Sequence, residues 1–163
     1  MDILLINIGD VRKLTNLSIN VSSSKFKQYI ISAQNIQLKE LIGKDCLEEL
    51  KNAKCDKTTT PLQDELLDIV YPYLINYSYA KYVYSSPLTS TEEGIVKLSG
   101  DNIIHLTDQE KKREQHFYTS NAEGYRDQIL ELLDNNVEGF PCYHTTGKCS
   151  CCSAEHDGLS IFN

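Results

Sequence analysis

The sequence predicts a mainly α-helical fold: a bundle of three to four helices, two of them long, with an inserted β-hairpin arm and an irregular C-terminal tail. Apolar residues recur at helical spacing in three segments, that period is lost at about residues 85–106, and no pattern follows Asn136. The chain has 163 residues, 40% of them apolar, which is enough for one domain with a hydrophobic core. We therefore expect a helical domain over residues 1–136, with the arm at about 85–106, and a Cys-rich tail over residues 137–163.

Two helices are expected in the first third of the chain. The serines at 22–24 can act as N-caps for a helix that runs to about Leu41, and Gly43 suits its C-terminal cap. Asp45 and Glu48 have the spacing of a capping box, which predicts a second, short helix. The polar composition that follows predicts a loop up to Thr59.

The first long helix has the best-marked start in the chain. Thr60 can serve as its N-cap, Pro61 as its first residue and Gln63 as the capping-box partner. The helix is expected to continue to about Tyr84, and Pro72 is expected to kink or split it. Its core-facing stripe consists of Leu62, Leu66, Ile69, Tyr73, Tyr77, Ala80 and Tyr84.

A second apolar stripe lies nearly opposite the first on this helix, formed by Tyr71, Ile75, Tyr79 and Tyr82. A helix that is apolar on two sides must be buried on two sides, and a chain this short has few other helices to cover the second one. This stripe predicts a packing surface between subunits. The alternative is that the tyrosines lie at the surface of a monomer with their hydroxyls in water.

The arm and the second long helix follow. Ser85, Ser86 and Pro87 stop the preceding helix, and apolar residues at 94–98 and 103–106 flank a turn-forming segment, which predicts two short strands. Thr107 and Glu110 then form another capping-box signature, opening a helix to about Asn135. Its core-facing stripe is Tyr118, Ala122, Tyr125, Ile129, Leu132 and Leu133.

The tail holds the candidate metal ligands, which are Cys142, His144, Cys149, Cys151, Cys152 and His156. Structural zinc sites usually use two short-spaced ligand pairs separated by a longer loop, and the spacing here is irregular. Three interpretations stay open: a structural zinc site, a redox or intersubunit disulfide, and free thiols. We expect no cofactor, with zinc as the only candidate.

Charge and motifs exclude several classes of function. The formal net charge of −7 disfavours a protein that binds nucleic acid through its phosphates. No apolar stretch approaches the roughly 20 residues of a membrane helix, and no basic region precedes the apolar N-terminus, so we expect a soluble protein without a membrane partner. The four histidines lie far apart and outside any hydrolase or metalloprotease motif, so we expect no enzyme.

Three runs of sequence, at residues 21–34, 38–43 and 46–50, resemble the first helices of the head-to-tail connector (adaptor) proteins of tailed phages. The resemblance is closest to ring or head-completion proteins of crAss-like and related Bacteroidetes phages. The tyrosine-rich helix followed by residues 91–98 is similar to the helix and G-(I/V)-V loop of the same family. The resemblance covers roughly residues 2–135, and the Cys-rich tail departs from it.

This resemblance implies a structural virion protein at the head-tail junction, assembled in the host cytoplasm. Its copies would form a ring, often of twelve, below the portal protein, extend the DNA channel and dock the next tail component. Genomic DNA would pass through without sequence-specific binding, which suits an acidic protein. The alternative function is a small zinc-binding adaptor or regulatory module that acts through its Cys/His tail.

Overall fold

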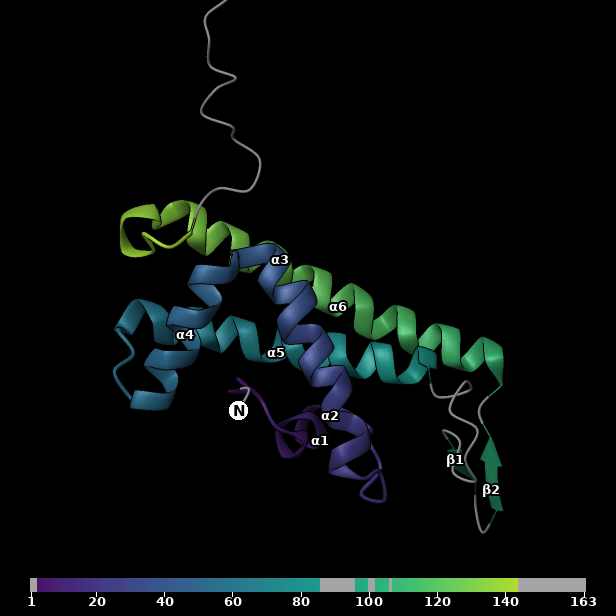
Figure 1. Cartoon of the computed structure of the whole chain (residues 1–163). Helices are drawn as coiled ribbons and strands as arrows, with labels where there is room; N and C mark the ends of the chain where they lie inside the picture. Colours follow the sequence, from purple (N-terminus) through teal and green to yellow (C-terminus); the bar gives the residue numbers. More distant parts are fainter. Residues whose placement is uncertain (1–2, 86–95, 100–101, 106, 144–163) are drawn as a thin grey trace, which may run out of the picture.

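The computed structural model describes residues 3–85, 96–99, 102–105 and 107–143, and these are mainly helical, as the sequence predicts. Two long helices, α5 (Pro61–Ser85) and α6 (Asp108–Asn135), lie side by side, and shorter helices pack across them (Figure 1). The shorter elements are α1 (Ile8–Leu14), α2 (Ser23–Ser32), a π-helical segment (Ala33–Leu38), α3 (Lys39–Ile42), α4 (Lys44–Asp56) and a 3₁₀ turn (Val137–Gly139). In the part of the chain described, no helix combines the length and hydrophobicity needed to span a bilayer.

Both long helices begin where the sequence predicts. At α5 the Thr60 backbone N–H donates to Gln63 Oε1 at 3.0 Å, and the Gln63 N–H donates to Thr60 Oγ1 at 3.2 Å. At α6 Thr107 and Glu110 form the same reciprocal pair. These bonds satisfy backbone donors that a helix leaves unpaired at its first turn, so the predicted capping boxes are confirmed.

Part of the second apolar face of α5, which the sequence predicted as a packing surface between subunits, is covered within the chain. Ile75 and Tyr79 are each only 3% exposed. The ring of Tyr79 meets the ring of Tyr118 from α6 edge-on, with centroids 4.5 Å apart. The N-terminal helices pack on α5 as well, and they supply the cover that the sequence analysis did not foresee.

Helix α5 is not split at Pro72. Within it the Asn76 side-chain amide donates to the Pro72 carbonyl at 2.7 Å. The interior proline is therefore accommodated within a continuous helix.

The predicted helix over residues 22–41 is continuous but contains the π-helical segment. There Gln34 is fully buried, accepts from the Leu5 backbone N–H at 2.7 Å and donates to the Ile3 carbonyl at 2.9 Å. The helix ends at Gly43, whose φ of +85° is in the region that favours glycine. The π-helical segment thus positions the buried amide that holds the N-terminal residues.

Helix α4 differs from its prediction at both ends. Its N-cap is Gly43, with no side-chain hydrogen bond, so the predicted Asp45 capping box is wrong. It continues to Asp56, although the sequence predicted a loop from residue 53. Lys57 ends the helix in a left-handed conformation, and the Thr58 N–H reaches the Ala53 carbonyl at 2.9 Å. This termination satisfies late carbonyls of the helix, which lets α4 run longer than its composition indicates.

Helix α1 was not predicted. Asn7 and Asp10 form a capping box at its start, and Arg12 donates to the carbonyls of Ile19 and Val21 at 3.0 and 2.7 Å. These bonds hold the segment between α1 and α2. Two turns of helix are too short for a clear apolar period, and only the Asn7 and Asp10 spacing marks it in the sequence.

In the expected arm, two strands, β1 (Val96–Ser99) and β2 (Asn102–His105), pair antiparallel with Val96 opposite His105. The rest of the arm after residue 85, including the turn at 100–101, lies outside the described residues. The two strands lie near the C-terminal end of α5 and the N-terminal end of α6 (Figure 1).

The first residues of the expected tail pack on the helical domain. Phe140 and Tyr143 are buried, and both belong to the hydrophobic core. The packed helical domain therefore includes residues beyond the expected boundary at residue 136, up to at least Tyr143. Residues 144–163 lie outside the described part.

Candidate functional site

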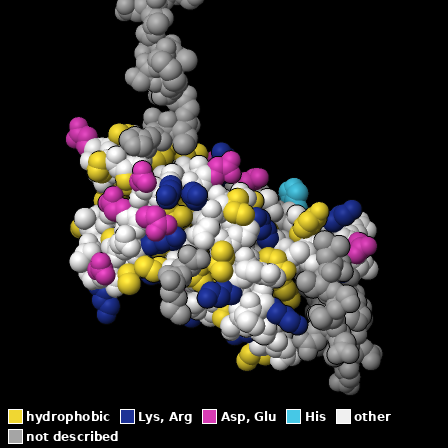
Figure 2. Space-filling view, in the orientation of Figure 1, with side chains coloured by type: hydrophobic (Ala, Val, Ile, Leu, Met, Phe, Trp, Pro, Cys, Tyr) yellow, Lys and Arg dark blue, Asp and Glu magenta, His cyan; other side chains and the backbone are white. Residues whose placement is uncertain are grey.

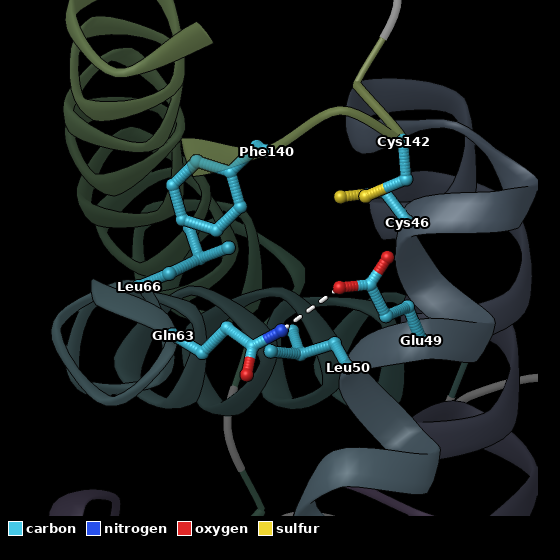
Figure 3. A pocket seen from close by; sticks show the side chains of 7 residues that line it. All are labelled: Cys46, Glu49, Leu50, Gln63, Leu66, Phe140 and Cys142. Carbon is cyan, nitrogen blue, oxygen red and sulfur yellow. Dashed lines mark hydrogen bonds between the residues drawn. The ribbon is translucent and has the colours of Figure 1, made fainter. Parts of the chain in front are cut away.

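Two cysteines far apart in the sequence meet where the end of the described chain packs on α4. Cys46 comes from the first turn of α4, Cys142 follows the 3₁₀ turn, and their sulfur atoms face each other (Figure 3). The site is lined by Cys46, Glu49, Leu50, Gln63, Leu66, Phe140 and Cys142. These side chains close on one another and leave no water-sized space, so the site is a contact between thiols and not a substrate pocket.

Packing on both sides fixes the positions of the two thiols. Leu47 and Leu50 are buried and hold α4 against the core. Cys46, directly before Leu47, is only 2% exposed. On the other side, Phe140 is buried beside Leu66, and the Tyr143 hydroxyl donates to the Asp134 carboxylate at 3.4 Å. Cys142 lies between two anchored aromatic residues and is therefore held toward α4.

The electrostatic surroundings of both thiols favour their protonated form. Burial raises the pKa of the Cys46 thiol far above its usual value, and the neighbouring Cys142 and Glu49 raise it further. Burial also raises the pKa of Cys142, whereas its hydrogen bond with Cys46 acts in the opposite direction. The Glu49 carboxylate is held in place by the Gln63 side-chain amide, which donates to it at 3.0 Å. Cys142 is the less buried of the two, so it is the thiol that a reagent from solution reaches first.

Of the candidate zinc ligands, only Cys142 lies in the described part, and His144, Cys149, Cys151, Cys152 and His156 lie outside it. Within residues 3–143, gaps excepted, no group of three His, Cys, Asp or Glu side chains is arranged to hold a metal ion. Cys142 contacts Cys46 instead, which is not among the candidate ligands that the sequence predicts. The two cysteines are 96 positions apart, and no local pattern signals their proximity.

The predicted subunit-packing residues fall into two groups. Ile75 and Tyr79 are core residues of the single chain, as described above. Tyr71 and Tyr82 are partly exposed. The Lys54 ammonium lies 4.5 Å from the centre of the Tyr71 ring, and the Tyr82 ring packs on Phe26 and Tyr29 with centroids 5.4 and 5.6 Å apart.

Large hydrophobic side chains are exposed elsewhere, on both long helices and on α1. Tyr84, near the end of α5, is 65% exposed, and Phe117 on α6 is 58% exposed. Leu14 is exposed as well, and the nearby Asn16 backbone is a hydrogen-bond partner of Tyr118. Figure 2 shows hydrophobic side chains exposed among Lys and Arg across the middle of one face, with acidic side chains gathered toward the side where α4 lies.

The model of a family of unknown function (DUF6712) matches residues 38–153 of the chain. The matched region covers more than half of the chain and includes both long helices, the arm and the two facing cysteines. No curated protein and no solved structure matches the chain.

Proposed function

The chain belongs to the family of unknown function DUF6712, and we propose that it is a structural virion protein, a subunit of the head-to-tail connector ring of a tailed phage. In this role its copies associate below the portal protein, extend the DNA channel and present a docking surface to the next tail component. The proposal rests on the resemblance of residues 2–135 to connector proteins and on the following properties of the surface and the charge.

The main structural support is the exposure of Tyr84 and Phe117 on the two long helices. A ring of identical subunits requires two different surfaces on each subunit that bind each other, and exposed aromatic side chains are enriched in such contacts. Tyr84 and Phe117 are aromatic and more than half exposed, so burial of both would contribute to association. The partly exposed rings of Tyr71 and Tyr82 extend the surface available to a neighbour.

The shape of the domain gives further support. The arm strands lie at one end of the paired helices α5 and α6, and residues 140–143 lie at the other end (Figure 1). A subunit with segments at both ends of a helical rod can contact neighbours on both sides. In this proposal the arm, over about residues 85–106, contacts the adjacent subunit or the channel, and the tail from residue 144 docks on an adjacent component.

The charge of the chain is compatible with a conduit for DNA. Proteins that hold DNA tightly do so with clustered Lys and Arg that release counterions from the phosphates. The net charge of −7 opposes such binding, so DNA would slide past the wall without being retained.

Electron microscopy of the full chain, alone and with the portal protein of its own phage, tests the proposal. The expected result is a closed ring with rotational symmetry at the portal vertex. The double substitution Tyr84→Ser and Phe117→Ser should reduce ring formation without lowering the melting temperature. Val137→Ser, at an exposed residue near the opposite end, should leave both ring formation and the melting temperature unchanged. A chain that stays monomeric with the portal present, or whose state depends on zinc chelation, would contradict the connector role and, in the second case, favour the zinc-binding adaptor.

A further inference from the structure

We infer that Cys46 and Cys142 form a disulfide within one chain when the protein meets a low-molecular-weight disulfide such as oxidised glutathione. The bond joins α4 to the segment at 140–143. This inference concerns a modification site of the folded chain and does not depend on the proposed assembly.

The geometry of the two thiols supports the inference. They come from segments 96 positions apart, yet they share a hydrogen bond and face each other across a closed contact (Figure 3). Both are free thiols in the structure. A disulfide forms only between cysteines whose backbones lie close together and whose side chains point toward each other, and tertiary packing has brought these two side chains face to face.

The other described cysteine provides an internal comparison. Cys55 lies on α4 nine residues after Cys46, which places it on the opposite face of the helix at about 100° per residue. It is exposed, whereas Cys46 is buried. Cys55 is therefore accessible to reagents but faces away from Cys142. If Cys46 and not Cys55 bonds to Cys142, proximity and not exposure decides which thiol of α4 reacts.

The anchors of the 140–143 segment keep the pair aligned. Phe140 is buried in the core, Tyr143 is bonded to Asp134, and the Tyr143 N–H also donates to the Phe140 carbonyl at 2.9 Å. A cysteine held between these contacts loses little conformational freedom when it bonds to Cys46. This arrangement favours the bond within the chain over a bond between two chains.

The reaction proceeds by two exchanges. The Cys142 thiol loses its proton, and the thiolate attacks one sulfur of oxidised glutathione, which forms a mixed disulfide and releases one glutathione thiolate. The Cys46 thiol then loses its proton and attacks the Cys142 sulfur, which forms the protein disulfide and releases the second glutathione. The two released thiolates take up the two protons, so the protein dithiol is oxidised and one glutathione disulfide is reduced to two thiols.

The bond should stabilise the fold. It closes a loop of nearly a hundred residues in the unfolded chain and so removes conformational freedom from that state. For a protein of this size the expected rise in melting temperature is on the order of 10 °C. The rise should be independent of protein concentration and should disappear on reduction.

Peptide mapping of the full chain is the direct test. After incubation with oxidised glutathione, remaining thiols are blocked with N-ethylmaleimide at low pH, and the unfolded protein is digested with trypsin without reduction. Trypsin releases each relevant cysteine separately: Cys46 in 45–51, Cys55 in 55–57, Cys142 in 127–148, and the last three in 149–163. The expected product is 45–51 joined to 127–148, two hydrogen atoms lighter than the sum of the two peptides.

A variant that combines Cys55→Ser, Cys149→Ser, Cys151→Ser and Cys152→Ser keeps only Cys46 and Cys142. Its titratable thiols should fall from two to none on oxidation, its mass on a non-reducing gel should stay that of a monomer, and its melting temperature should rise. Adding Cys142→Ser to this variant should abolish both the loss of thiols and the rise in melting temperature. The inference is overturned if Cys142 pairs with a tail cysteine or with a second chain, if Cys46 stays a thiol, or if stoichiometric zinc bound by the pair blocks oxidation.

Discussion

Gly139 lies directly against Leu62, so that a Cβ atom at position 139 would overlap the Leu62 Cδ2 atom. This contact joins the 3₁₀ turn after α6 to the first turn of α5, next to the buried Phe140. A side chain at residue 139 would require either the Leu62 side chain or the turn to shift. Gly139 therefore helps to bring the segment that carries Cys142 onto the domain.

Gly139→Ala should lower the stability of the protein by about 1–2 kcal/mol, because either Leu62 or the turn must move to accommodate the methyl group. Gly124→Ala is a matched control within α6, where a Cβ would meet no atom within 4 Å. This second change should stabilise the protein by about 0.5–1 kcal/mol through helix propensity alone. Chemical denaturation of both variants measures the difference, and equal effects would show that the Leu62 contact has no energetic role.

The position at which the chain is truncated should decide whether the domain stays folded. A chain ending at residue 143 keeps every buried residue of the described structure. A chain ending at residue 136 loses Phe140 and Tyr143, and removal of buried aromatic side chains typically costs about 3 kcal/mol or more. Thermal unfolding followed by circular dichroism should show a normal melting temperature for the first truncation and a clear decrease for the second. If the two melt alike, the 137–143 segment does not contribute to the core.

Replacement of Gln34 should release the N-terminal residues. Its side chain satisfies the Leu5 N–H and the Ile3 carbonyl in a buried setting, so Gln34→Leu leaves both groups without their partner at a cost of about 2 kcal/mol. Gln37→Leu makes the same chemical change three residues later at a half-buried position and should have a smaller effect. Amide hydrogen exchange at Leu5, compared between the two variants, distinguishes a local release from general destabilisation.

Local signals account for the parts of the fold that could be predicted. The starts of α5 and α6 depend on Thr60 with Gln63 and on Thr107 with Glu110, which are contacts between residues three apart, so the sequence contains all that is needed. The Asp45 capping box failed because the spacing is necessary but not sufficient, and Gly43 supplies the cap position instead.

Long-range packing determines what the sequence could not predict. Periodicity showed that α5 is apolar on two faces, but it could not show that α6 and the N-terminal helices cover Ile75 and Tyr79. The contact between Cys46 and Cys142 likewise depends on Phe140, which is buried in the core and anchors the segment that carries Cys142. Cysteine spacing drew attention to the tail, whereas the described partner of Cys142 lies on α4.

Buried tyrosines should make the protein sensitive to alkaline pH. Burial raises the pKa of Tyr73 to about 12, with a smaller contribution from the neighbouring Tyr77, and burial also raises the pKa of Tyr79. Ionisation therefore occurs more readily in the unfolded chain, where tyrosine has a pKa of about 10. The stability linked to Tyr73 is fully present below pH 10 and is lost progressively as the pH rises through 12.

The melting temperature should accordingly fall between about pH 10 and pH 12. The chain contains no tryptophan, so tyrosinate absorbance near 295 nm can be followed in the same samples. Tyr73→Phe removes the ionisable group while keeping the buried ring, so it should reduce the loss of stability across this range, whereas Tyr84→Phe, at an exposed residue, should leave the profile unchanged. A Tyr73→Phe profile that coincides with that of the unmodified protein would contradict the assignment, because the buried Tyr73 hydroxyl would then not be the group whose ionisation opposes folding.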